Sequence, residues 1–181
     1  MRFLHAGCGT ADLPPYFDGL KLDVVRLDID PGMKPDIVAS IADLGDIGHF
    51  DIVYASHCLE RLYPQYVKKA LSEFYRVADT AIVVVPDLTD VKATEDFLYE
   101  SPGGPICGLD MIYGCRTDIE LTPYMAHHSG FVVETLEAAM SDAGFVQVTM
   151  IRLFPYNLMA VGQKRKHAQE KTPEVVEAKA A

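Results

Sequence analysis

Long hydrophobic runs are missing from this sequence of 181 residues, and no stretch is apolar enough over sufficient length to span a membrane. A secretory signal is missing as well, because the opening MRFLHAGCG contains no apolar core of the required length. We therefore expect a cytoplasmic protein without a membrane partner. A chain of this length, of which 49% is hydrophobic, can fold as one domain with a full core.

Cysteine is scarce, and its spacing does not suit a metal. The four cysteines include no CxxC pair: Cys8, Cys58, Cys107 and Cys115. This pattern is typical of reduced thiols in a cytosolic protein and predicts no zinc site.

Basic residues are too few to balance the acidic ones, and the formal net charge is −10. Residues 163–181 contain five basic and three acidic residues, which leaves 11 and 23 in residues 1–162. A body this acidic repels a phosphate backbone, so nucleic acid is a disfavoured partner. Residues 164–181 are charged and rich in alanine, and we predict a disordered tail there.

Short apolar segments alternate with connections along the chain. Residues 2–6, 23–30, 36–40, 50–56 and 80–86 predict strands. Apolar residues at helical spacing predict one helix that begins near Pro64 and another over about 131–143, which Gly144 ends. The segments on either side of Pro155 predict a closing hairpin. The fold class is therefore α/β: a Rossmann-like, doubly wound, mostly parallel seven-stranded sheet with helices on both faces and a C-terminal antiparallel hairpin strand.

Residues 87–130 differ from the rest, since they are rich in Gly, Pro, Asp and Tyr and have weak periodicity. A segment this long between core elements is more often functional than ornamental. We expect it to form a substrate-binding or lid insertion.

The stretch HAGCGTADLPP, residues 5–15, places two glycines directly after the first strand. Glycines there serve simple turns, and they also let a ligand approach the backbone closely. Asp28, at the end of the second strand, could accept hydrogen bonds from both hydroxyls of a ribose, which favours an adenosine-containing ligand. Asp12 occupies the place of the third glycine of a dinucleotide fingerprint and would repel a pyrophosphate. A cofactor with a positive centre and no phosphate, such as S-adenosylmethionine, fits better than a dinucleotide.

Taken together, these motifs resemble the class I S-adenosylmethionine-dependent methyltransferases, in particular a small bacterial type. The resemblance lies in LHAGCGT at 4–10, LPPY at 13–16, LDIDP at 27–31, SIADL at 40–44 and FDIVYASHCLERL at 50–62. It covers residues 2–86 and continues at 127–145. It implies a methyltransferase domain over residues 1–163 that uses S-adenosylmethionine, releases S-adenosylhomocysteine and acts on a small-molecule or saccharide-like acceptor.

The resemblance also implies which residues contact the cofactor. Asp28 would bind the ribose and Ile29 would lie against the adenine. The remaining implied contacts lie under the methionine and ribose, along the adenine edge, and beside the transferred methyl: His5, Ala6, Gly7, Cys8 and Gly9; Ser40, Ile41 and Asp43; Ala55, Ser56 and His57.

Three positions depart from the family pattern. His5 stands where an acid is common, Ser40 where an Asp commonly binds the adenine amino group, and Arg61 where a His is usual. They keep open a second interpretation, a catalytically degenerate module with this fold that binds a partner. The sequence given begins at the first predicted strand, without the N-terminal helices that cover the cofactor in larger members. We therefore expect a pocket that is open, or closed by residues 87–130, or closed by a second copy in a homodimer.

A general base is needed when the acceptor must lose a proton, and two histidines are candidates for that role. His57 could instead touch the cofactor through its backbone alone. His128 could instead cap the following helix together with Ser129.

Overall fold

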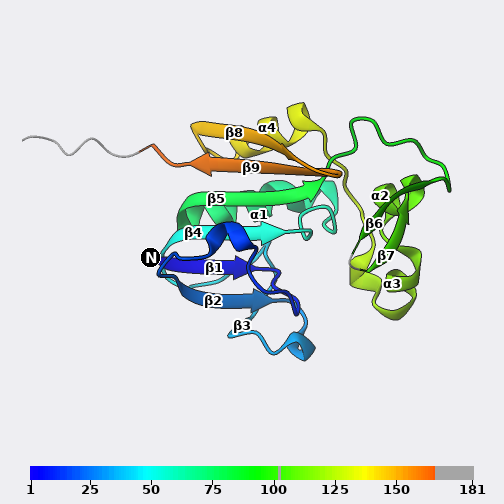
Figure 1. Ribbon diagram of the computed structural model, residues 1–181. Helices are drawn as coiled ribbons and strands as arrows, with labels where there is room; N and C mark the ends of the chain where they lie inside the picture. The colour runs from blue at the N-terminus through cyan, green and yellow to red at the C-terminus, as the bar shows by residue number, and fades with distance from the viewer. Residues whose placement is uncertain (102, 166–181) are drawn as a thin grey trace, which may run out of the picture.

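One seven-stranded sheet organises the computed structural model, which describes residues 1–101 and 103–165 (Figure 1). The strand order is β3-β2-β1-β4-β5-β9-β8. Strand β9 is antiparallel to β5 and to β8, and the other neighbouring pairs are parallel. The predicted fold class is therefore confirmed. The bounds are β1 Arg2–Ala6, β2 Asp23–Asp28, β3 Ile37–Val38, β4 Phe50–Ser56, β5 Ala78–Pro86, β8 Gln147–Leu153 and β9 Asn157–Gln163.

Two predicted strands are shorter than expected: β2 covers Asp23–Asp28 of the predicted 23–30, and β3 covers Ile37–Val38 of the predicted 36–40. β2 ends at Asp28 because the chain then turns through the 3-10 turn η2, Pro31–Met33. Asp30 starts that turn by accepting the Gly32 N–H at 2.7 Å. Of the tail predicted over residues 164–181, Lys164 is held to the sheet, since its N–H donates to the Asp79 carbonyl. Residues 166–181 lie outside the described residues.

The two longer helices share one face of the sheet. Helix α1, Pro64–Val77, begins at the predicted proline, which suits a first turn because its missing N–H is not needed there. Helix α4, Val133–Asp142, begins after Phe131, which pairs with Asp87 in a β-bridge instead of entering the helix. Both helices pack on the strands in the main hydrophobic core. Within residues 1–101 and 103–165, no helix has the length and apolar character that crossing a bilayer requires.

The other face of the sheet is covered differently from what we expected. The 3-10 turn η1, Pro15–Phe17, lies over β1 and β4 (Figure 1), and Phe17 joins a small cluster with Phe3, Tyr54 and Val84. No α-helix of the described chain covers this face, because the β1–β2 connection is short and carries adjacent prolines. A proline inside a helix removes a hydrogen bond and clashes with the preceding turn.

The predicted insertion is a small subdomain that leaves β5 at Asp87 and returns at Phe131. It lies beyond the carboxyl ends of β1, β4 and β5 (Figure 1). The Leu88 N–H donates to the Phe131 carbonyl at 3.0 Å, which ties its two ends together. Its elements are β6 Phe97–Ser101, β7 Gly104–Cys107, α2 Gly108–Tyr113, α3 Arg116–Leu121 and the 3-10 turn η3 Pro123–Met125.

Candidate functional site

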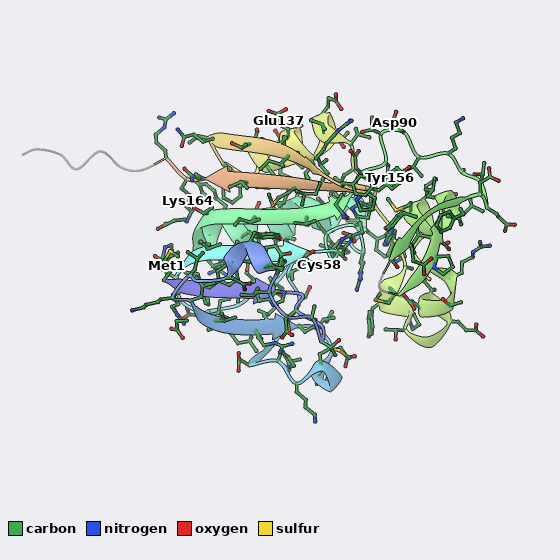
Figure 2. All side chains as sticks on the ribbon, viewed as in Figure 1. Met1, Cys58, Asp90, Glu137, Tyr156 and Lys164 are labelled. Atoms are coloured by element: carbon green, nitrogen blue, oxygen red, sulfur yellow. The ribbon has the colours of Figure 1, made fainter. Side chains whose placement is uncertain are left out.

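Most of the residues singled out in the sequence gather at one edge of the sheet, where the carboxyl ends of β1, β2 and β4 meet. Figure 2 shows Cys58 at this edge and Met1 and Lys164 at the opposite one. Ligands of open α/β sheets bind outside the carboxyl ends of the strands. A hollow of about 580 Å³ lies at the other end, lined by Val146, Gln147, Gln163, Lys164 and Arg165, and is separate from this site.

The two glycines after β1 have different reasons to be glycine. Both have a positive φ, +68° at Gly7 and +48° at Gly9. A Cβ on Gly7 would lie 2.9 Å from the Cβ and Sγ of Cys58, so Gly7 lets this loop pack on the loop after β4. A Cβ on Gly9 would meet nothing within 4 Å. Gly9 therefore borders open space, where a ligand can reach the backbone.

Asp28 holds the glycine loop and the start of η2 at once. One carboxylate oxygen accepts the Gly9 N–H at 2.8 Å, and the other accepts the Asp30 N–H at 2.9 Å. Arg26 donates to the Gly9 carbonyl at 2.8 Å, so both backbone groups of Gly9 are fixed. A carboxylate has about four acceptor positions. Two of them remain for hydroxyl donors such as those of a ribose.

His5 is buried and stays neutral at pH 7. Its pKa is lowered to about 4, first by burial and then by the Arg26 charge, while Asp28 acts in the opposite direction. Its ring lies 5.5 Å from that of Tyr54. His5 therefore supplies a neutral ring where the family commonly has a carboxylate. Ala6 and Cys8 are buried beside it.

The segment predicted to edge the adenine lies next to Asp28, whose carbonyl accepts the Ala39 N–H at 3.0 Å. Ile29 is 51% exposed, an unusual position for an isoleucine and one that suits contact with a flat apolar group. Ser40 and Asp43 pair in a β-bridge. The Ile41 side chain is buried in the main core, so it faces away from this edge.

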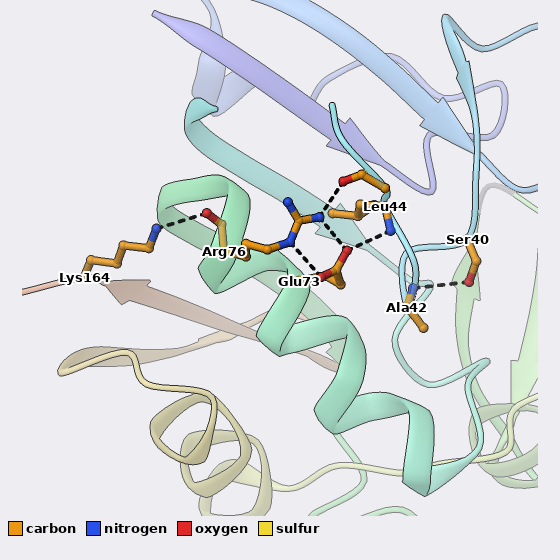
Figure 3. A network of polar contacts seen from close by, with 7 residues as sticks. Ser40, Ala42, Leu44, Glu73, Arg76 and Lys164 are labelled. Atoms are coloured by element: carbon orange, nitrogen blue, oxygen red, sulfur yellow. Dashed lines mark hydrogen bonds and ion pairs between the residues drawn. The ribbon is translucent and has the colours of Figure 1, made fainter. Parts of the chain in front are cut away.

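Helix α1 fixes this same segment from behind (Figure 3). A Glu73 oxygen accepts the Leu44 N–H at 2.9 Å and an Arg76 N–H at 2.7 Å. Arg76 also donates to the Gly45 carbonyl at 2.6 Å. The pKa of Glu73 is lowered, first by the hydrogen bonds from Arg76. The pair stays charged at neutral pH and anchors residues 44–45 to the helix.

The end of β4 places a histidine at the centre of the edge. Ala55 is buried and Ser56 half-buried, and the His57 N–H donates to the Val84 carbonyl at 2.9 Å. His57 has φ +51°, a conformation that costs a non-glycine residue about 1 kcal/mol or more. Its ring is 42% exposed, and Nδ1 lies 3.5 Å from Glu60 Oε1. The chain thus bends to point this ring toward Glu60.

Glu60 was not predicted, and it is the most unusual group of the site. It is 1% exposed, and neither carboxylate oxygen has a hydrogen-bond partner among the described residues. His127 Nε2 lies 3.9 Å from Oε1, and His127 Nδ1 lies 3.1 Å from the Met111 carbonyl. The sequence signal was a glutamate three residues after His57, beside the buried Leu59.

The second predicted histidine has a different environment. The His128 ring stacks on Tyr63 with centroids 4.2 Å apart. The backbone N–H groups of His128 and Ser129 donate to the Glu60 carbonyl. The capping interpretation of these two residues is therefore wrong, and Thr135 accepts the Val132 N–H at the start of α4 instead. The preceding residue, His127, and not His128, approaches the Glu60 carboxylate.

Metal-ligand geometry is not found in the part of the chain that the structure describes. No group of three or more His, Cys, Asp or Glu side chains there could hold a metal ion.

Residues 4–81 match the family model described as a methyltransferase domain. Among solved structures, a methyltransferase from Archaeoglobus fulgidus has a TM-score of 0.62 at 15% identity, with 90% of this chain and 86% of that chain covered. PigF in complex with S-adenosylhomocysteine has a TM-score of 0.58 at 16% identity, with 90% of this chain covered. The N-terminal domain of EvdMO1 with S-adenosylhomocysteine and D-fucose has a TM-score of 0.55 at 16% identity, covering 91% and 76%.

The chain has the methyltransferase fold. The match over residues 4–81 and this fold agree with the family resemblance drawn from the sequence. The chain spans half the length of the PigF chain, so the methyltransferase-type unit matches only part of that protein. Among curated proteins, none matches the sequence.

Proposed function

We propose that the protein is an S-adenosylmethionine-dependent methyltransferase that acts on a small-molecule acceptor. The observation that carries this proposal is the Asp28–Gly9 arrangement. A carboxylate at the end of β2 has acceptor positions left, beside a glycine whose outer side is open. The strand order and the family match over residues 4–81 support the same conclusion.

The residues at the carboxyl edge fit this cofactor. Asp28 would accept the ribose hydroxyls, and the exposed Ile29 would cover one side of the adenine. The backbone at Gly9 would lie beneath the methionine and ribose. A pyrophosphate fits less well, because Asp12 and Asp28 are both close to this loop.

The chemical demand on the protein is modest, because S-adenosylmethionine supplies a methyl group already activated on a sulfonium. The chain therefore has to align the acceptor and exclude water. The insertion formed by residues 87–130 lies beyond the strand ends, where it can do both. His57, at the end of β4, is the side chain we propose for contact with the acceptor.

The acceptor class is a narrower proposal. One structural neighbour, EvdMO1, was solved with D-fucose as well as S-adenosylhomocysteine, which supports saccharides as a class to test. The acidic composition disfavours nucleic acid, as stated above.

Calorimetric titration of the protein with S-adenosylmethionine, S-adenosylhomocysteine and NAD tests the proposal. Micromolar binding of either adenosyl ligand, without NAD binding, supports it. A folded protein that binds neither contradicts it and favours the degenerate, partner-binding module. Light scattering of the same sample tests the homodimer, which stays a prediction.

A further inference from the structure

The Glu60 carboxylate has no evident structural purpose. Burying an ionised carboxylate without a partner costs several kcal/mol. Ionised carboxylates persist in cores when they are paired, and the two carboxylate oxygens of Glu60 accept no hydrogen bond within the described chain. If position 60 served packing alone, an apolar side chain such as leucine or methionine would suit it better, because the position is as buried as that of Leu59 beside it.

Two imidazole rings are the partners within reach. His57 approaches Oε1 from the same loop at 3.5 Å, and His127 approaches the same atom from the segment before α4 at 3.9 Å. One carboxylate oxygen therefore faces nitrogen atoms of two rings. Two further titratable groups are coupled to this cluster: the Arg61 charge acts on His127, and Glu60 acts on the Cys58 thiol.

The two rings differ in access to solvent. The His57 ring is 42% exposed, whereas the His127 ring is 12% exposed. The Met111 carbonyl of α2 lies 3.1 Å from His127 Nδ1, so this nitrogen carries the hydrogen in the neutral ring. Its Nε2 then directs a lone pair toward Glu60. The cluster therefore has one inner ring shielded from solvent and one ring that solvent reaches.

We propose that His57, Glu60 and His127 form a proton-accepting cluster, and that the methyl acceptor is consequently a neutral group that must lose a proton, namely a hydroxyl. This inference rests on the proposed function. His57 is the catalytic residue, and Glu60 and His127 are positioning residues that act through it.

The transfer balances as follows. The acceptor O–H gives its proton to His57 Nε2, while Nδ1–H points to Glu60. The oxygen forms a bond to the methyl carbon as the carbon–sulfur bond breaks, and the electron pair of that bond stays on sulfur. The products are the methyl ether, S-adenosylhomocysteine and an imidazolium at His57, stabilised by the Glu60 carboxylate. That proton then leaves to solvent through the exposed ring.

The first arm of the test needs neither cofactor nor acceptor. Histidine ring NMR of the ligand-free protein follows the titration of His127, whose pKa is lowered, first by burial; within that shift Glu60 acts to raise the pKa and His57 to lower it. Glu60→Gln should lower the His127 pKa, and His57→Asn should raise it. The control is His49→Asn, which removes a surface histidine 3.1 Å from Asp79. It should leave the His127 titration unchanged. An unchanged His127 titration in both site variants overturns the cluster.

The second arm compares acceptors with and without a proton to lose. Formation of S-adenosylhomocysteine is measured with phenol and D-fucose as hydroxyl probes and with pyridine as a probe that has a free lone pair. Transfer to the hydroxyl probes should fall about 10²-fold or more in His57→Asn and in Glu60→Gln, and should lose its dependence on pH at the acidic side. Transfer to pyridine, which has no proton to lose, should fall far less than transfer to the hydroxyl probes in the same variant.

The outcomes separate this inference from the proposed function. If the unaltered protein does not bind S-adenosylmethionine, the proposed methyltransferase function is contradicted, whatever the NMR result. Normal cofactor binding with hydroxyl transfer unaffected by His57→Asn, or with no hydroxyl probe methylated at all, overturns the inference alone. Calorimetry and melting curves of each variant establish that it is folded and still binds the cofactor.

Discussion

The Asp28 side chain carries the proposed cofactor site, and its removal is a direct test. Asp28→Ala should weaken S-adenosylmethionine binding by about 1–3 kcal/mol, because hydrogen bonds to a charged carboxylate are lost. The matched control is Asp30→Ala, since Asp30 accepts only a turn N–H two residues away. Calorimetry of both variants checks this. An equal loss in the two would mean that Asp28 acts by shaping the turn.

The two glycines of the loop should respond differently to the same substitution. Gly7→Ala adds a methyl group 2.9 Å from Cys58 in a left-handed conformation, so it should lower the free energy of unfolding by more than about 2 kcal/mol. Gly9→Ala meets open space and should cost about 1 kcal/mol, yet weaken cofactor binding. Urea unfolding and calorimetry measure the two effects. If Gly9→Ala binds as well as the unaltered protein, the ligand does not approach there.

Which site residues could be predicted depended on how far apart their partners lie in the sequence. Asp28 was predictable because its spacing from the glycines is set by one strand–turn–strand unit. Glu60 was not, because its burial and its contact with His127 come from the return of the insertion to the sheet edge. The same contact explains the choice between neighbouring histidines: His127 points inward and His128 onto Tyr63.

Helix α1 supports the predicted adenine edge through Glu73. Glu73→Gln should lower the free energy of unfolding by about 1 kcal/mol at pH 7, because a charge-assisted pair with Arg76 is weakened. The folded-state pKa of Glu73 is lowered from 4.5, so this stabilisation is present above that pH. It is lost as the pH falls through the lower folded value, and the two proteins should then converge.

Urea unfolding at several pH values checks this. The control is Glu137→Gln, because Glu137 is an exposed residue of α4. A difference that persists at the lowest pH would show that Glu73 contributes through packing and not through its charge.

The bounds of helices and strands were predicted correctly where neighbouring residues in the sequence determine them. The bounds of α1 and β4 follow from Pro64 and from the short, mostly apolar segment FDIVYAS, which are local signals in the sequence. The start of α4 was displaced because Phe131 pairs with Asp87, a contact between distant segments. The presence of the insertion was predictable, but its helices and strands were not, since these short elements are held by contacts such as Asp110 with Cys107 and Arg116 and not by periodicity.

The chain as a whole should lose stability on mild acidification, and His5 is the main reason. An imidazole in the unfolded chain takes up a proton near pH 6.5, whereas burial lowers the folded pKa to about 4. Between these values the unfolded state binds more protons, so the free energy of unfolding falls as the pH decreases. The full shift corresponds to about 3 kcal/mol. His127, whose pKa is also lowered by burial, acts in the same direction.

His5→Asn should therefore flatten the pH dependence of the unfolding free energy between pH 6.5 and about 4, even if the variant is less stable at pH 7. The exposed His49 should not matter, so His49→Asn should keep the slope of the unaltered protein. Urea unfolding across this range measures the slopes. A variant without His5 that keeps the full slope would assign the acid sensitivity to other buried groups, with His127 the next to test. S-adenosylmethionine should raise the free energy of unfolding throughout this pH range, since a ligand that binds the folded state stabilises it.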